Sequence, residues 1–104
     1  MPPRRLHGFR EPAGDHAELL ARWETERDIV RYAVMLLVLV DDRRMPVVLF
    51  DCSHDERNDR HDYTRNGIKG LAVIFHYGTP GEAMRDAIAL IREGHERMIE
   101  SWQQ

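Results

Sequence analysis

Cysteine and lysine are almost absent from this chain of 104 residues, which contains one of each, Cys52 and Lys69. A single cysteine excludes an internal disulfide framework and a zinc site built from cysteines, and it is typical of a reducing compartment. The longest apolar run, at residues 33–40, is far shorter than the roughly 20 residues that span a bilayer. The basic residues 1–10 are not followed by an apolar run, so no secretory signal is expected. We therefore expect a cytoplasmic protein without a membrane partner.

Several catalytic and nucleotide-binding motifs are also missing. No G-x-S-x-G, Walker or G-x-G-x-x-G pattern occurs, so neither a hydrolase elbow nor a nucleotide cofactor is expected. The net charge of −3 argues against a protein that coats nucleic acid or an anionic membrane. Among the basic residues, 14 are arginines. Arginine suits phosphate and carboxylate recognition, but a GC-rich coding bias produces the same excess without a function.

Helix and turn signals divide the chain into an irregular N-terminal arm, residues 1–14, and a single α+β domain, residues 15–104. Asp15 is positioned to cap a short helix over residues 16–24. Four strands are predicted from β-branched runs and turn signals, over residues 28–40, 45–52, 60–65 and 68–77. A capping box at Thr79 and Glu82, with Pro80 between them, predicts a helix that continues to about Trp102. The expected fold is a four-stranded antiparallel β-meander packed against one long C-terminal helix.

Strand alternation assigns the side chains to two faces of this sheet. The face expected beneath the helix is entirely apolar and contains Ala33, Met35, Leu37, Val48, Phe50, Leu71, Val73 and Phe75. The second face combines an aliphatic patch with polar groups: Val34, Leu36, Val38, Val47, Leu49, Asp51, His61, Tyr63 and His76. Because an uncovered aliphatic patch usually marks an interface, we expect a homodimer through this second face. The alternative is that the short N-terminal helix covers it.

Chemistry-bearing side chains are concentrated in residues 50–65. A histidine hydrogen-bonded to a carboxylate can act as a general base near neutral pH, and the predicted register places Asp51, His61 and Tyr63 on one face. Arg57 and Arg60 flank this group and are suited to hold a phosphate. The alternative interpretation is a solvated loop whose charges neutralise one another. No compact H-x-x-H or H-E-x-x-H spacing occurs, so no metal is expected.

The same segment shows a resemblance to a known family. An aliphatic strand ends in Phe50 and Asp51, a turn contains His54, and the next strand contains His61 and Tyr63. This arrangement, followed by a capped helix, resembles the TumE-type toxins of bacterial toxin–antitoxin pairs and related small domains. The similarity spans residues 45–100.

The resemblance implies a small toxin that acts on RNA and is held inactive by a small antitoxin. Its catalytic residues would be Asp51, His54, His61 and Tyr63, and its substrate-binding residues Arg57, Arg60 and Arg65. The family often has glycine after the first histidine, whereas this chain has Asp55, which argues against a loop that faces phosphate. The competing hypothesis is a non-enzymatic homodimeric interaction module.

Overall fold

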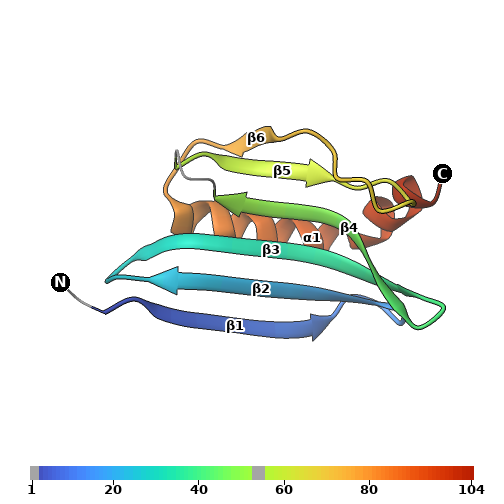
Figure 1. The fold of residues 1–104 in the computed structure, drawn as a ribbon, viewed down its shortest axis with the longest axis horizontal. Helices are drawn as coiled ribbons and strands as arrows, with labels where there is room; N and C mark the ends of the chain where they lie inside the picture. Colours follow the sequence, from blue (N-terminus) through green and yellow to red (C-terminus); the bar gives the residue numbers. More distant parts are fainter. Residues whose placement is uncertain (1–2, 53–55) are drawn as a thin grey trace.

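The fold combines one antiparallel sheet with one long helix. The computed structural model describes residues 3–52 and 56–104. In chain order the elements are β1 (Arg5–Pro12), β2 (Ala17–Thr25), β3 (Ile29–Val40), β4 (Arg43–Cys52), β5 (Asn58–Asp62), β6 (Val73–His76) and α1 (Pro80–Gln103). The strands lie side by side in sequence order, and α1 crosses one face of the sheet (Figure 1). The expected α+β class is confirmed, but the sheet has six strands rather than four.

The two additional strands come from the N-terminal quarter of the chain. Residues 5–12, expected as part of an irregular arm, form β1, and residues 17–25 form β2 where a helix over residues 16–24 was expected. Both expectations are wrong for a tertiary reason. Leu19 and Ala21 lie opposite Leu36 and Val34 of β3 and are buried, so cross-strand packing overrides the weak local preference for helix.

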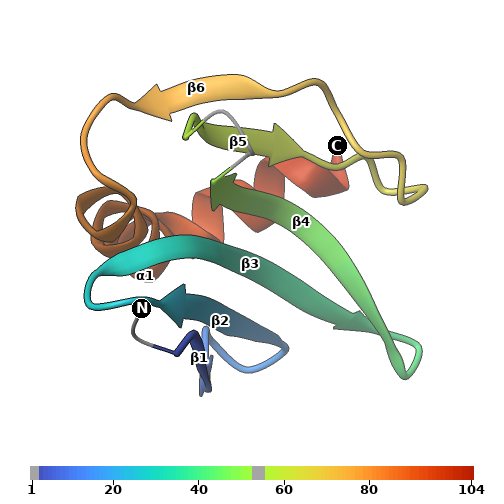
Figure 2. The ribbon, with the colours of Figure 1, turned by 60° about the vertical axis from the view of Figure 1, so that its left-hand side comes forward.

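The C-terminal helix begins and ends close to where the sequence predicts. Thr79 is its N-cap, Pro80 occupies the first turn, and the side chains of Thr79 and Glu82 form the reciprocal capping box. The buried face of α1 packs against β3 and β4, with β2 at its margin (Figure 2). Its buried side chains are Ala83, Met84, Ala87, Ile88, Ile91 and Trp102. Among the residues described, no helix is both long enough and apolar enough to cross a membrane.

A β-bulge reverses the predicted faces of β3. Leu37 lies opposite Pro46, but the next pair is Leu36 with Val48, which leaves Val47 as an extra residue in β4. One extra residue exchanges the two faces beyond it, since side chains alternate with a period of two. Val34, Leu36 and Val38 therefore lie in the core beneath α1, and Ala33, Met35 and Leu37 lie on the other face. The sequence correctly predicted that Val48 and Phe50 lie beneath α1. It wrongly predicted this position for Ala33, Met35 and Leu37.

We call the face of the sheet that points away from α1 the open face. One cross-strand row runs over it from edge to edge, through Gly8, Arg22, Ala33, Asp51, Asp59 and Ile74. The neighbouring row contains Arg10, Leu20, Met35, Leu49 and His61. The open face therefore carries an apolar stripe beside a group of ionisable side chains. The stripe consists of Leu20, Met35 and Leu49, and the ionisable group of Arg22, Asp51, Asp59 and His61.

Candidate active site on the open face

Asp51 and His61 meet on the open face, on the neighbouring strands β4 and β5. The Nε2 atom of His61 lies 3.6 Å from Oδ1 of Asp51. The predicted register placed Asp51 opposite Tyr63, whereas the structure places it opposite Asp59. This difference is an even number of residues, so the side chains remain on the predicted face. The sequence therefore predicted the proximity of Asp51 and His61 even though its register was wrong.

The orientation of the His61 ring follows from a backbone contact. Its Nδ1 lies 3.0 Å from the carbonyl oxygen of Gly70. A carbonyl only accepts hydrogen bonds, so Nδ1 carries the proton and donates, which leaves Nε2 directed at Asp51. The side chains of His61 and Asp51 are 14% and 29% exposed. Both are therefore largely shielded from solvent, but a ligand can still reach the carboxyl group of Asp51.

Burial raises the pKa of Asp51 above its ordinary value, because a partly desolvated carboxylate is disfavoured. The charges of His61 and Lys69 oppose this effect, and the neighbouring Asp59 reinforces it. Asp59 is itself 5% exposed and accepts a hydrogen bond from Arg57 at 3.2 Å. The site thus combines a carboxyl group that protonates more readily than usual with an oriented imidazole, which is the combination general acid–base chemistry requires.

A groove of about 410 Å³ adjoins Asp51 on the open face. Ala33 lies between Arg22 and Asp51 in the cross-strand row, and its small side chain leaves the space between them open. Arg31, which lies 3.9 Å from Glu24, also lines the groove. Arg22 and Arg31 therefore line this groove together with two acidic residues, Asp51 and Glu24.

The three arginines expected to hold substrate are not gathered at this site. Arg57 contributes through its contact with Asp59. The guanidinium of Arg60 lies over the Phe50 ring on the α1 side of the sheet, 5.4 Å from the ring centroid, and Arg65 donates to the carbonyl oxygen of Gln103. Sequence reasoning missed Arg22, because a helix was expected where β2 carries this residue onto the open face.

The remaining predicted site residues are placed differently. His54 lies outside the described residues. Tyr63 follows the end of β5, where it forms an isolated bridge with Lys69 and its N–H donates to the carbonyl of Val47. Cys52 is buried, as expected, and burial raises the pKa of its thiol. In the described parts of the chain, no three histidine, cysteine or acidic side chains form a group that could hold a metal ion.

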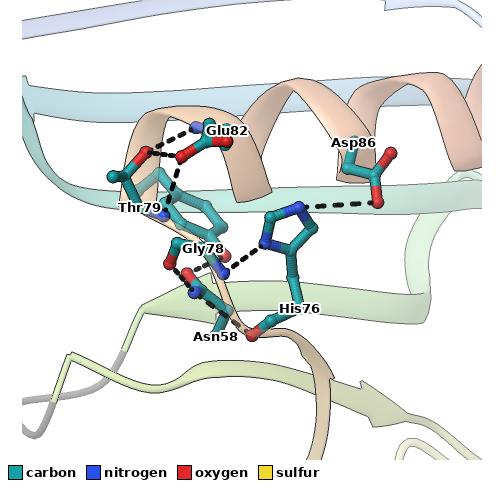
Figure 3. Close-up of polar contacts among 7 residues, drawn as sticks. Asn58, His76, Gly78, Thr79, Glu82 and Asp86 are labelled. Carbon is teal, nitrogen blue, oxygen red and sulfur yellow. Dashed lines mark hydrogen bonds and ion pairs between the residues drawn. The ribbon is translucent and has the colours of Figure 1, made fainter.

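His76 does not share the open face with Asp51 and His61, as the predicted register required. A register shift between Asn58 and Asp59 places Asn58 opposite His76. The Nδ1 atom of His76 accepts a hydrogen bond from the N–H of Gly78 at 2.9 Å, and its Nε2 lies 4.0 Å from Oδ2 of Asp86 (Figure 3). The expectation that His76 shares the open face is therefore wrong. His76 instead contacts Gly78, just before α1, and lies near Asp86 of the helix.

Asn58 is a buried polar residue that sequence reasoning did not identify. Its Oδ1 accepts from the hydroxyl of Tyr32 at 2.8 Å, and its Nδ2 donates to the carbonyls of Gly78 and His76 at 3.0 and 3.4 Å. Figure 3 shows Asn58 beside the segment that joins β6 to α1. Asn58 thus connects β5 to β3 and to the approach to the helix, and so supports the strand that carries His61.

Comparison with known proteins identifies the family of this chain but no function. A family model described as a domain of unknown function, DUF7718, matches residues 4–104. Comparison with curated proteins found no match, and comparison with solved structures found none either. Because the model spans nearly the whole sequence, the chain belongs to the DUF7718 family.

Proposed function

We propose that this protein is a toxin-like enzyme of the cytoplasm that cleaves RNA by general acid–base chemistry, with Asp51 as the base and His61 as the residue that positions it. The observation that carries the proposal is the contact between these two side chains beside an open groove. The resemblance of residues 45–100 to TumE-type toxins supports the same activity and adds a small antitoxin partner.

In the proposed reaction, Asp51 is the group that contacts substrate. Its carboxylate accepts the proton of a ribose 2′-hydroxyl as that oxygen bonds to phosphorus, the bond from phosphorus to the 5′-oxygen breaks, and water protonates the leaving oxygen. His61 is a positioning residue: Gly70 sets its tautomer, and its unprotonated Nε2 faces the carboxyl group as an acceptor for the proton that Asp51 takes up. The products are a 2′,3′-cyclic phosphate and a 5′-hydroxyl end.

The groove supplies the positive charge that this reaction needs. Arg22 and Arg31 bind the phosphate and stabilise the charge that develops on it. The overall charge of −3 provides no long-range attraction for RNA, so affinity depends on these local contacts and falls as salt is added.

Growth of a bacterial host after induced expression tests the proposal, with Asp51→Asn and His61→Gln as variants. The control is His16→Gln, which changes an exposed histidine in the turn between β1 and β2. The parent and the control are expected to arrest growth, and the two site variants to permit it at matched soluble levels. Purified parent protein should also cleave total RNA to fragments with 5′-hydroxyl ends. Because this assay uses purified protein, an antitoxin in the host cannot mask the activity.

Failure of the purified protein to cleave RNA, or unchanged cleavage by Asp51→Asn, would contradict an enzymatic role. A second candidate function is then a non-enzymatic homodimeric interaction module. The observation that favours it is the exposure of large apolar side chains in and beside β6, where Leu71 and Tyr77 are each 90% exposed and Val73 is 64% exposed.

A further inference from the structure

A second groove, of about 740 Å³, lies at the end of the molecule where α1 ends, and we call it the end groove. The turn between β1 and β2, the end of β3 and the last turns of α1 come together there (Figure 1). Its lining comes from residues 13–17, 38–41, 95–96, 99–100 and 103. None of these residues lines the groove beside Asp51, so the two grooves are separate surfaces.

The floor of the end groove is apolar. Val38 belongs to the core beneath α1, and strand alternation places Val40 on the same side of the sheet. Ile99 comes from the helix and packs against the edge of the core. Val38 is buried, Ile99 is half-buried and Val40 is 38% exposed. Val40 and Ile99 therefore present apolar surface that a bound side chain can remove from water.

Four carboxylates surround this apolar floor. Asp15 belongs to the β1–β2 turn and Asp41 to the β3–β4 turn, while Glu96 and Glu100 lie one helical turn apart on α1. All four side chains are exposed, and none of them has an ion-pair partner in the described parts of the chain. The lining contains neither arginine nor lysine.

The absence of pairing is local to the end groove. Glu11 and Glu18, on the strands that flank the β1–β2 turn, each contact an arginine, at 2.6 and 3.4 Å. Arg43 and Arg65 line a neighbouring hollow instead, and Arg65 donates to the carbonyl oxygen of Gln103. The end groove thus combines apolar surface with negative charge that no described arginine or lysine side chain neutralises by direct contact.

We propose that the end groove docks a basic amphipathic segment of a partner protein. An apolar side chain of that segment covers Val40 and Ile99, and its arginine or lysine side chains pair with the surrounding carboxylates. The carboxylates belong to three separate parts of the chain, so they match a segment with several cationic residues better than a single small cation. An acidic or uncharged segment would bury them without a counter-charge, which disfavours it.

Fluorescence anisotropy of the full chain with a labelled octapeptide of arginine and leucine tests the docking. The double variant Glu96→Gln with Glu100→Gln should raise the dissociation constant of the peptide at least about fivefold. The matched control is Asp28→Asn with Glu93→Gln, which changes the net charge equally at exposed positions outside the groove. Because distant exposed charges are screened by salt, the control should change the dissociation constant less than about twofold.

The apolar part of the interface is tested separately. Val40→Thr keeps the branched shape of the side chain but adds a hydroxyl, so it should weaken binding. Val73→Thr makes the same change at an exposed position outside the groove and should leave binding unchanged. A peptide with serine in place of leucine should bind more weakly than the original, and a peptide with glutamate in place of arginine should not bind. Circular dichroism establishes that each variant folds.

Three results would overturn the proposal. The first is a chain that does not bind the arginine and leucine peptide even at millimolar concentration. The second is equal weakening by the two double variants, which would mean that net charge alone attracts the peptide. The third is binding of the serine peptide or of spermidine as tight as that of the leucine peptide, since the apolar floor would then contribute nothing. RNA cleavage plays no part in these readouts, so its failure would leave them unaffected.

Discussion

Replacement of Asn58 by alanine tests the polar connection that supports β5. Asn58 is 1% exposed, and alanine leaves three groups without this partner: the hydroxyl of the buried Tyr32, and the carbonyls of the half-buried His76 and the exposed Gly78. Two of the contacts are short, at 2.8 and 3.0 Å, and the third is long, at 3.4 Å. The cost is expected to come mainly from the two short contacts.

The buried Tyr32 hydroxyl, left unsatisfied, costs about 1–3 kcal/mol, and loss of the hydrogen bond to the exposed Gly78 costs about 1 kcal/mol, so the free energy of unfolding falls by about 2–4 kcal/mol. That is a large part of the roughly 5–15 kcal/mol available to a domain of this size. At about 4–8 °C for each kcal/mol, the melting temperature should fall by roughly 10–30 °C. Tyr32→Phe removes one of the same contacts, so the double variant should lose less than the sum of the single losses.

Urea unfolding followed by circular dichroism measures these differences, with Asn66→Ala as the control at an exposed turn position. Asn58→Asp adds a sharper comparison, because a carboxylate accepts from Tyr32 but cannot donate to the carbonyls of Gly78 and His76. Its stability should recover in acid, where the protonated side chain can donate. An Asn58→Ala protein within about 0.5 kcal/mol of the parent would refute the reasoning, as would additive losses in the double variant.

Two further predictions concern the helix start and the candidate site. Thr79→Ala removes the acceptor for the N–H of Glu82, at 3.2 Å, and should cost about 1 kcal/mol by thermal unfolding, whereas Thr79→Ser should cost much less. Asp51 has a pKa raised by burial, so the folded state binds its proton more tightly than the unfolded state, and stability from this group is lost as the pH rises through the raised pKa. Asp51→Asn should therefore stabilise the fold relative to the parent near neutral pH and lose that advantage in acid, in urea unfolding at several pH values. A constant difference across pH would contradict this assignment.

The features predicted well from sequence depend on neighbouring residues along the chain. The capping box of Thr79 and Glu82 is a contact over three positions, and its geometry is local. The reversal near Asn66 was also correctly located, although Gly67, with φ +81°, closes a longer turn in which the N–H of Thr64 donates to Ile68. Beyond this turn, β5 and β6 pair in the register that the sequence predicts, with Arg60 opposite Val73.

The failures depend on partners that are distant in sequence. A bulge at Val47 decided which residues of β3 face α1, and pairing with β3 decided that residues 17–25 form a strand. The proximity of Asp51 and His61 was predictable because strand alternation survives a register error of even length. No local pattern could indicate that Arg22 shares a groove with Asp51, since that contact requires β2 in the sheet.

The sequence by itself determined the α+β class, the extent and cap of the C-terminal helix and the shared face of Asp51 and His61, because each depends on periodicity or on contacts between near neighbours. Only the tertiary structure decided the number of strands, the face buried beneath α1 and the arginines beside the candidate site. These depend on cross-strand packing and on a single extra residue in β4, whose energies arise between segments far apart in the chain.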